Sequence, residues 1–212
     1  MSGPRLVLAT RNPHKVLELR RILAGAGLEV DLVGLDDPGL EPMTEVAETG
    51  ATFAANALLK AHALAEATGL PALADDSGLC VDALNGMPGV LSARWSGRHG
   101  DDVANLRLVL DQLADVPDDR RGAAFVCAAA AAWPDGTDIV AEGRWDGVVG
   151  REPRGRNGFG YDPIFRPQGE TRTSAELTED EKDAASHRGR AFRRLVPLLA
   201  PRLAASHPPV RS

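Results

Sequence analysis

The chain has 212 residues, of which 43% are hydrophobic and 25% charged, a composition typical of a soluble globular protein with a sizeable core. Its formal net charge of −6 argues against broad, sequence-independent binding of nucleic acid. No apolar run approaches the length of a membrane span and no signal peptide is visible, so we expect a cytoplasmic protein that does not bind membranes. Cys80 and Cys127 lack metal-site spacing and are expected to be buried, reduced thiols.

Apolar spacing and turn residues divide the chain into alternating strands and helices. Trp133–Gly136 predicts the turn of a hairpin, although the alanines before it would also suit a helix. The predicted strands cover 5–10, 29–35, 70–75, 123–133 and 138–145. The predicted helices run from Asn12-Pro13 to Gly27, over 51–68, from Asp101 or Asp102 to about 114, from the capping box at Thr178, and from Ser186 to Leu203. We therefore expect an α/β domain with a mixed sheet, followed by a disordered tail over 206–212.

Residues Ala74 to Gly78 place two adjacent carboxylates after an apolar run. A strand that ends in acidic residues and glycine puts charge at the rim of a sheet, where α/β proteins bind ligands. Because Mg²⁺ is held by one or two carboxylates with phosphate oxygens and water, Asp76 is a candidate metal ligand or base. Glu48 would add a second carboxylate. A solvated turn is the alternative for the aspartates, and a solvated loop is the alternative for Glu45 and Glu48.

The strand-to-helix junction Thr10–Lys15 is a candidate anion site. Backbone N–H groups at a helix N-terminus and the helix dipole both attract anions. The cation of Lys15 in the first turn opposes that dipole, which indicates that an anion shares the space. The alternative is a capped helix with a solvated lysine, and it applies to His14 as well.

The segment Gly155–Pro163 suits a nucleotide base. Its three glycines let the backbone approach a ligand, Phe159 and Tyr161 offer rings for stacking, and Asp162 could accept from a base N–H. The alternative is a glycine-rich hairpin turn, with Phe159 as the aromatic residue expected in the core.

A basic cluster follows at Lys182, His187 and Arg188. On a continuous helix these side chains would not share a face, but a break near Ser186 would let them converge on a phosphate. The alternative is a basic helix surface. Together the four clusters supply a carboxylate for Mg²⁺, phosphate-binding cations, aromatic platforms and a helix N-terminus, which indicates hydrolysis of a nucleoside polyphosphate.

These segments, in this order, resemble the inosine/xanthosine triphosphate pyrophosphatase family over residues 5–200. The matching motifs are Thr-x-Asn-x-x-Lys, Ala-Asp-Asp-Ser-Gly-Leu, Asn-Gly-x-Pro-Gly-Val, Ser-Ala-Arg-Trp, Gly-Phe-Gly-Tyr-Asp-Pro-Ile-Phe and Glu-Lys-x-x-x-Ser-His-Arg. The resemblance implies Mg²⁺-dependent hydrolysis of ITP, dITP and XTP to the monophosphate and pyrophosphate, which cleans the nucleotide pool. It also implies a homodimer and a single ITPase-like α/β domain over 1–205. That domain would have two lobes, a central mixed sheet flanked by helices, and an active-site cleft between the lobes.

The resemblance assigns roles to particular residues. Asp76 becomes the proton acceptor and a metal ligand, with Glu48 as a further ligand. The substrate-binding residues that it implies are Thr10, Arg11, Asn12, Pro13, His14, Lys15, Ser77, Phe159, Gly160, Tyr161, Asp162, Lys182, His187 and Arg188. Relatives often have a small residue where this chain has Arg11, so a solvent-facing side chain is the alternative there.

Two other functions stay open at this point. One is a pyrophosphatase of the same fold that acts on other modified nucleotides, and the other is a nucleotide sensor that does not hydrolyse its ligand. A Nudix or HD-type hydrolase is disfavoured because the chain has neither a Nudix box nor a His-Asp dipeptide.

Overall fold

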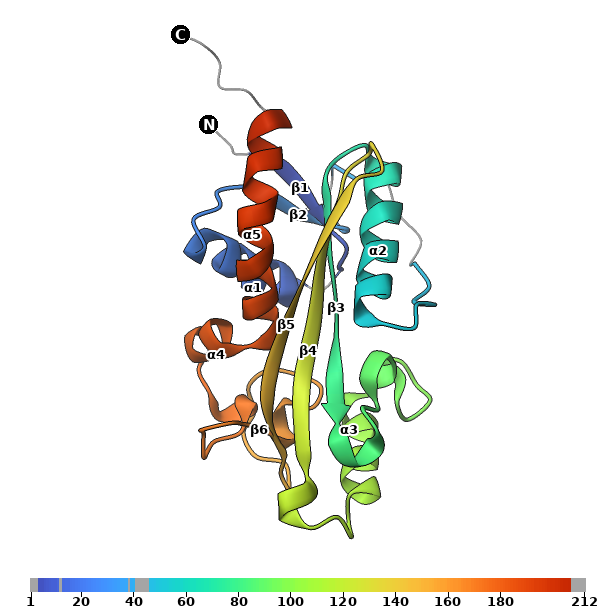
Figure 1. The fold of residues 1–212 in the computed structure, drawn as a ribbon, viewed down its shortest axis with the longest axis vertical. Helices are drawn as coiled ribbons and strands as arrows, with labels where there is room; N and C mark the ends of the chain where they lie inside the picture. The colour runs from blue at the N-terminus through green and yellow to red at the C-terminus, as the bar shows by residue number, and fades with distance from the viewer. Residues whose placement is uncertain (1–3, 12, 38, 41–45, 207–212) are drawn as a thin grey trace. The chain divides into compact units, whose positions relative to one another are not determined.

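The computed structural model describes residues 4–11, 13–37, 39–40 and 46–206 (Figure 1). Its strands are β1 (Arg5–Leu8), β2 (Asp31–Gly34), β3 (Ala72–Val81), β4 (Gly122–Ala132), β5 (Asp138–Val149) and β6 (Phe165–Pro167). Its helices are α1 (Pro13–Gly25), α2 (Phe53–Thr68), α3 (Asp102–Gln112), α4 (Glu179–Ala185) and α5 (His187–Ser206). Among these helices, none is long and apolar enough to cross a membrane.

The strands pair in the order β2-β1-β3-β4-β5-β6. Strand β1 runs parallel to β2 and to β3, whereas β6 is antiparallel to β5. The expected α/β fold with a mixed sheet is therefore confirmed. The chain forms two compact units, the first from Met1–Asp76, Ala128–Gly143 and Gly189–Ser212 and the second from Ser77–Cys127 and Arg144–Arg188. Strands β3, β4 and β5 each contribute residues to both units.

In the first unit, α2 lies on one side of the strands, and α1 and α5 lie on the other (Figure 1). Small residues of α2, including Ala57 and Ala61, are buried in one cluster with Ala72 and Ala74 of β3. Because successive strand residues point to opposite faces, Asp76 continues the row of Ala72 and Ala74 toward α2, and Asp75 points to the other face. Because side chains alternate along β3, the carboxylates of Asp75 and Asp76 lie on opposite faces of the strand.

Local signals define α2 as the sequence predicts. The Thr52 hydroxyl caps its first turn by accepting from the Ala55 N–H at 3.1 Å. Gly69 ends it in the left-handed conformation, with φ of +66°, and donates its N–H to Ala65 O. Glycine adopts this conformation without a Cβ penalty, so the helix ends at Thr68 with Gly69 as its cap.

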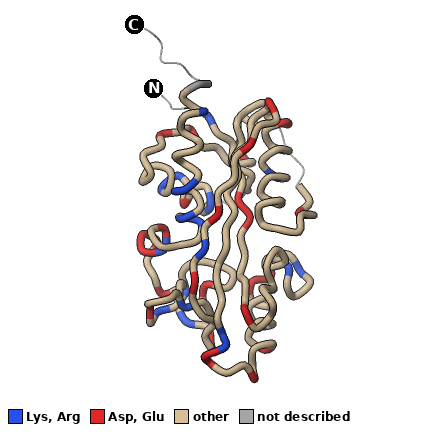
Figure 2. The backbone as a smooth tube through the Cα atoms, viewed as in Figure 1, with Lys and Arg blue, Asp and Glu red and all other residues tan. Residues whose placement is uncertain are grey.

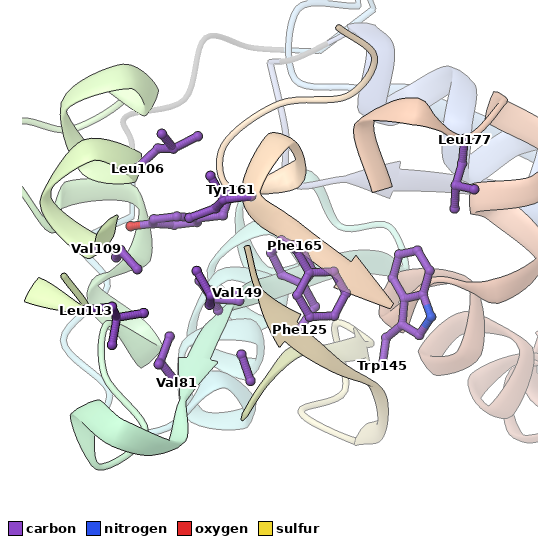
Figure 3. Close-up of a cluster of buried hydrophobic side chains, with 13 residues drawn as sticks. Val81, Leu106, Val109, Leu113, Phe125, Trp145, Val149, Tyr161, Phe165 and Leu177 are labelled. Atoms are coloured by element: carbon purple, nitrogen blue, oxygen red, sulfur yellow. The ribbon is translucent and has the colours of Figure 1, made fainter. Parts of the chain in front are cut away.

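The second unit has its own core. Leu106 and Val109 of α3 and the following Leu113 are buried in one cluster with Val81 at the end of β3 (Figure 3). Leu79 of β3 belongs to the same cluster. Phe125, Trp145 and Phe165 belong to the same cluster, and the Phe165 ring centroid lies 4.6 Å from that of Phe125 and 5.5 Å from that of Trp145. These edge-on aromatic contacts join β4, β5 and β6 at the centre of the unit.

One sequence-based expectation is wrong. We expected a strand to end at Asp75, with a solvated turn as the alternative. Strand β3 instead continues through Asp75 and Asp76 to Val81. Asp75 and Asp76 are 9% and 8% exposed, so neither side chain belongs to a solvated turn. The strand continues because β3 is central, with β1 and β4 on its two sides, and this pairing outweighs the low strand propensity of Asp and Gly.

The predicted helix break before α5 is confirmed. Ser186 has extended backbone angles, with φ of −64° and ψ of 157°, and donates its N–H to Lys182 O. It ends α4, and α5 begins at the next residue. Neither cysteine forms a disulfide, and Cys127 is buried as expected, but Cys80 is only partly buried, so the expectation of burial is wrong for Cys80. Of the expected tail, Ser206 ends α5 and residues 207–212 lie outside the described residues.

Candidate active site

Asp76 is held in the first unit by two polar side chains of α2. Its Oδ2 accepts from the Asn56 amide at 3.0 Å, and its Oδ1 lies 3.5 Å from Lys60 Nζ. Asn56 and Lys60 are one turn apart and therefore share a face of α2. The sequence analysis missed both residues. The available signal was a pair of polar residues at helical spacing inside an alanine-rich helix.

Lys60 links Glu48 to the acidic pair. Its Nζ donates to Glu48 Oε1 at 2.8 Å and to the backbone carbonyl of Asp75 at 2.6 Å. Burial by itself would lower the pKa of Lys60, but attraction by Asp76, Asp75 and Glu48 outweighs it and raises the pKa. Lys60 is therefore a fixed cation, and Glu48 belongs to the Asp76 cluster rather than to a solvated loop.

The pKa of Asp76 is raised above its ordinary value. Burial is the largest cause, and the negative charges of Glu48 and Asp75 act in the same direction. The charge of Lys60 and the hydrogen bond from Asn56 oppose the shift without cancelling it. A carboxylate with a raised pKa accepts a proton more readily near neutral pH, which suits a general base.

Asp75 faces a different cation. The Lys15 ammonium, on α1, lies 4.0 Å from Asp75 Oδ2. Lys60 and Lys15 thus approach adjacent aspartates from helices on opposite faces of β3. We call the group Lys15, Glu48, Lys60, Asp75 and Asp76 the acidic cluster.

The rest of the Thr10–Lys15 segment is described in part. Thr10 follows β1, and its carbonyl accepts from the Leu35 N–H at 3.0 Å. Arg11 is half exposed and pairs with Asp36 at 2.9 Å, in agreement with the solvent-facing alternative. Asn12 lies outside the described residues, and so do the side chains of Pro13 and His14. Their predicted contacts with substrate stay predictions.

The aromatic loop, which we define as Gly158–Asp162, lies in the second unit. Phe159 is 48% exposed, so the alternative that placed this residue in the core is wrong. Tyr161 is the buried ring instead, at 4% exposure, and its hydroxyl donates to the Ser92 carbonyl at 2.8 Å. Figure 3 shows the Tyr161 ring beside Leu106. Burial and the charge of Asp102 both raise the pKa of Tyr161, so its hydroxyl stays protonated.

Asp162 is an internal organiser of this loop. It is 3% exposed, its Oδ2 accepts from the Phe159 N–H at 2.9 Å and pairs with Lys182, and its Oδ1 accepts from the Ser174 hydroxyl at 2.6 Å. A Cβ at Gly158 would overlap Asp162 Oδ2, and the residue has a φ of +75°. Glycine is therefore required there by both the backbone angle and the close packing.

Two cations gather at the exposed Phe159 ring. Lys182 Nζ lies 5.3 Å and Arg188 Cζ lies 5.8 Å from the ring centroid, both within cation–π range. His187 is buried and stacks on Phe125 with ring centroids 4.8 Å apart and an angle of 12° between the planes. The break at Ser186 thus brings Lys182 and Arg188 to one aromatic ring, as the sequence analysis required.

The sequence profile of the Ham1 family matches residues 6–198 of the chain. The chain belongs to the Ham1 family. This Ham1-family chain is 66% identical over 195 residues to the dITP/XTP pyrophosphatase of Streptomyces coelicolor, covering 92% of this chain and 96% of that protein. It is 61% identical over 201 residues to the dITP/XTP pyrophosphatase of Nocardia farcinica, covering 94% and 97%.

Solved structures of similar proteins agree with this membership. A nucleoside-triphosphatase, dITP/XTP pyrophosphatase, from Mycobacterium abscessus is 59% identical, with a TM-score of 0.75, and the match covers 92% of this chain and 99% of that one. A HAM1 protein from Coxiella burnetii is 41% identical, with a TM-score of 0.82 over 93% and 99% of the two chains. The fold of this Ham1-family chain is therefore shared with solved relatives.

The acidic cluster of this Ham1-family chain suits a hard divalent cation. Within the described residues, no three His, Cys, Asp or Glu side chains gather as a closed metal site. Asp76 and Glu48, however, offer carboxylate oxygens to the same Lys60 ammonium, so two oxygen donors face one position. Mg²⁺ in nucleotide enzymes uses one or two carboxylates and completes its shell with phosphate oxygens and water, so this donor set fits Mg²⁺.

Proposed function

We propose that this chain hydrolyses non-standard purine nucleoside triphosphates, namely ITP, dITP and XTP, to the monophosphate and pyrophosphate. The observation that carries the proposal is the buried Asp76, with its raised pKa, in a chain 66% identical to a protein named dITP/XTP pyrophosphatase. The proposed role of the enzyme is to remove damaged purine nucleotides from the nucleotide pool.

Asp76 acts in this proposal as the proton acceptor for the attacking water. Its raised pKa makes it a stronger base than an ordinary aspartate. Asn56 donates a hydrogen bond to Oδ2 and so fixes the orientation of the carboxylate, and Oδ1, which lies 3.5 Å from Lys60 Nζ, takes the proton. Attack at the α-phosphorus breaks the bond from that phosphorus to the bridging oxygen of the β-phosphate, and pyrophosphate leaves with that oxygen.

The proposed cofactor is Mg²⁺, held by Asp76 and Glu48. When bound, it would neutralise phosphate charge and orient the triphosphate. The composition of the acidic cluster supports this role, because it gathers the carboxylates of Glu48 and Asp76 at one position, with the negative charge of Asp75 nearby. Lys60 keeps Glu48 and Asp76 together, and Lys15 offsets charge on the leaving pyrophosphate.

The segment Thr10–Lys15 is proposed to bind the triphosphate, and Ser77 to contact the substrate. Ser77 follows Asp76 directly on β3 and is partly exposed. Arg11 contributes least to this segment in our proposal, since its side chain pairs with Asp36 on the surface.

The purine base is proposed to stack on Phe159, whose ring is half exposed. The Phe159 N–H already donates to Asp162 and the Gly160 N–H to Asp102, so these amides are poor candidates for reading the base. We therefore assign recognition of the 6-oxo group to Lys182, His187 and Arg188. An amino group at that position would meet the cationic donors of Lys182 and Arg188, which cannot accept its hydrogens, and this penalises ATP.

The assembly and location follow from the resemblance and remain parts of the proposal. We propose a homodimer in the cytoplasm whose partner is a small nucleotide, without nucleic acid or membrane binding. Sedimentation at several concentrations would test the dimer.

The deciding experiment measures turnover of ITP, XTP, dITP, dGTP and dTTP with Mg²⁺, with pyrophosphate and orthophosphate assayed separately. We expect pyrophosphate from ITP, dITP and XTP and its loss in Asp76→Asn. Orthophosphate release, or equal activity on dGTP and dTTP, would mean a different phosphatase on this fold. Binding of ITP without turnover would instead indicate a sensor.

A further inference from the structure

Asp102 joins helix α3 to the aromatic loop. Its Oδ2 accepts from the Gly160 N–H at 2.8 Å, although the two residues are 58 positions apart in the chain. We propose that Asp102 is a positioning residue that holds the aromatic loop in the conformation that presents Phe159 to the purine base. The inference rests on the function proposed above and deepens it, because it names a residue outside the base site that sets base affinity.

The geometry of Gly160 explains why an anchor is needed. Gly160 has a φ of +61°, and nothing lies within 4 Å of where its Cβ would be. The space on that side of Gly160 is therefore open, and glycine has more backbone freedom to lose than any other residue. A hydrogen bond to a charged acceptor is stronger than one to a neutral acceptor, so the bond from the Gly160 N–H to Asp102 limits that freedom at the residue next to Phe159.

Helix α3 can hold Asp102 in a fixed position because hydrogen bonds join its first turns to Ala93 and Ser96. Asn105 is buried, its Oδ1 accepts from the Ser96 N–H at 2.7 Å, and its amide donates to the Ala93 carbonyl at 3.2 Å. The neighbouring Ser92 carbonyl accepts from Tyr161. The aromatic loop thus has two hydrogen bonds to this region. Gly160 donates to Asp102 of α3, and Tyr161 donates to Ser92, which precedes the residues that Asn105 binds.

The same arrangement gives the Ser-Ala-Arg-Trp motif a physical role that the sequence did not reveal. The Ser92 hydroxyl accepts from the Leu79 N–H at 3.0 Å and donates to the Gly89 carbonyl at 2.7 Å. Ser92 therefore connects β3 to the turn that receives Tyr161. In our proposal, Ser92 and Asp102 form the support on which the aromatic loop rests.

The chain offers a matched control beside Asp102. Asp101 is the N-cap of α3 and accepts from the Ala104 N–H at 3.0 Å. Asp101→Ala and Asp102→Ala each remove one carboxylate from the same turn. The first weakens the helix, whereas the second also releases Gly160.

The experiment compares wild type with Asp101→Ala, Asp102→Ala and Asp102→Asn by steady-state kinetics on ITP and by amide exchange at Gly160. In Asp102→Ala we expect the KM for ITP to rise about tenfold, kcat to stay within about twofold, and Gly160 exchange to accelerate about tenfold. Asp102→Asn keeps an acceptor oxygen and should recover most of the loss. Asp101→Ala should lower the melting temperature but leave KM and Gly160 exchange unchanged.

Three results would overturn the proposal. They are an unchanged KM in Asp102→Ala, an equal rise in Asp101→Ala, and a loss confined to kcat. Wild-type turnover tests the proposed function separately. If wild type binds ITP without hydrolysing it, that function fails, and the ITP dissociation constants of the same variants replace KM as the test of Asp102.

Discussion

The acidic cluster of the first unit and the aromatic loop of the second use the same residue type for opposite purposes. Burial raises the pKa of Asp76, and the two neighbouring carboxylates add to this shift. Asp162 and Asp102 instead accept from backbone N–H groups, and these bonds shape a loop. Asp76 is thus the aspartate to which we assign chemistry, whereas Asp102 and Asp162 are structural because backbone N–H groups donate to their oxygens.

The two regions also differ in how their cations are held. In the first unit, Lys15 and Lys60 meet carboxylates on the two faces of one strand. In the second, Lys182 and Arg188 converge on an aromatic ring. Figure 2 shows basic residues along α1 and α5 and acidic residues within the strands. Changes in the first unit should therefore alter catalysis and charge balance, and changes in the second should alter affinity.

Replacing Asp76 by Asn should give the largest effect. The variant keeps the shape of the side chain but removes the proton acceptor, so we expect kcat for ITP to fall by about 10³-fold. Its stability should not fall, because one buried negative charge is lost. Pyrophosphate release and thermal unfolding measure the two quantities. Activity within tenfold of wild type would contradict the role of Asp76 as the base.

Replacing Lys60 by Met should lower the stability of the folded protein, which would show how strongly the acidic cluster depends on its cation. Three carboxylates would lose the cation that contacts two of them, and breaking a buried ion pair from one side costs about 3 kcal/mol. Lys15→Met is the matched control with a smaller expected loss, since Lys15 is more exposed and 4.0 Å from Asp75. Urea unfolding of both variants measures the difference. Equal losses would show that Lys60 has no special part in the acidic cluster.

Replacing Phe159 by Leu should raise the KM for ITP about tenfold with little change in kcat, because base stacking is worth about 1–3 kcal/mol. Tyr161→Phe should behave differently. It removes a buried hydrogen bond to Ser92 and should cost about 1 kcal/mol of stability. Kinetics and denaturation together separate the two aromatics. A stability loss in Phe159→Leu that exceeds the loss in Tyr161→Phe would reverse their assigned roles.

The smallest expected effect is on how the stability of the folded protein depends on pH, and it comes from Glu181. The backbone of Thr178, followed by Arg172, lowers the pKa of Glu181 to about 2. A carboxylate with a lowered pKa stabilises the folded protein above its ordinary value of 4.5, and this contribution is lost as pH falls from there toward 2. The raised pKa of Asp76 has the opposite sign, so acid relieves its repulsion. Glu181→Gln should flatten the acid limb of the stability curve. An unchanged limb would contradict the prediction.

Local patterns determined much of this protein. Periodicity and capping signals such as Thr52, Gly69 and the Thr178 box define helices wherever nearby residues satisfy the backbone, because these signals act over a few positions. Motif order was sufficient to indicate the family, and the clusters around Asp76 and Phe159 were found as sequence segments. The break at Ser186 was also predictable, because Lys182 and Arg188 could not share a face on one continuous helix.

Only the tertiary structure decided where the side chains go. The acidic pair continues a strand because that strand is central, and strand position depends on pairing between distant segments. Phe159 is exposed and Tyr161 buried because the Ser92 carbonyl, 69 residues away, receives the tyrosine hydroxyl. The roles of Lys60, Asn56 and Asp102 likewise depend on contacts with residues that are distant in the chain. Such contacts join residues far apart in the chain, so a local pattern can single out a residue such as Lys60 but cannot identify its partner.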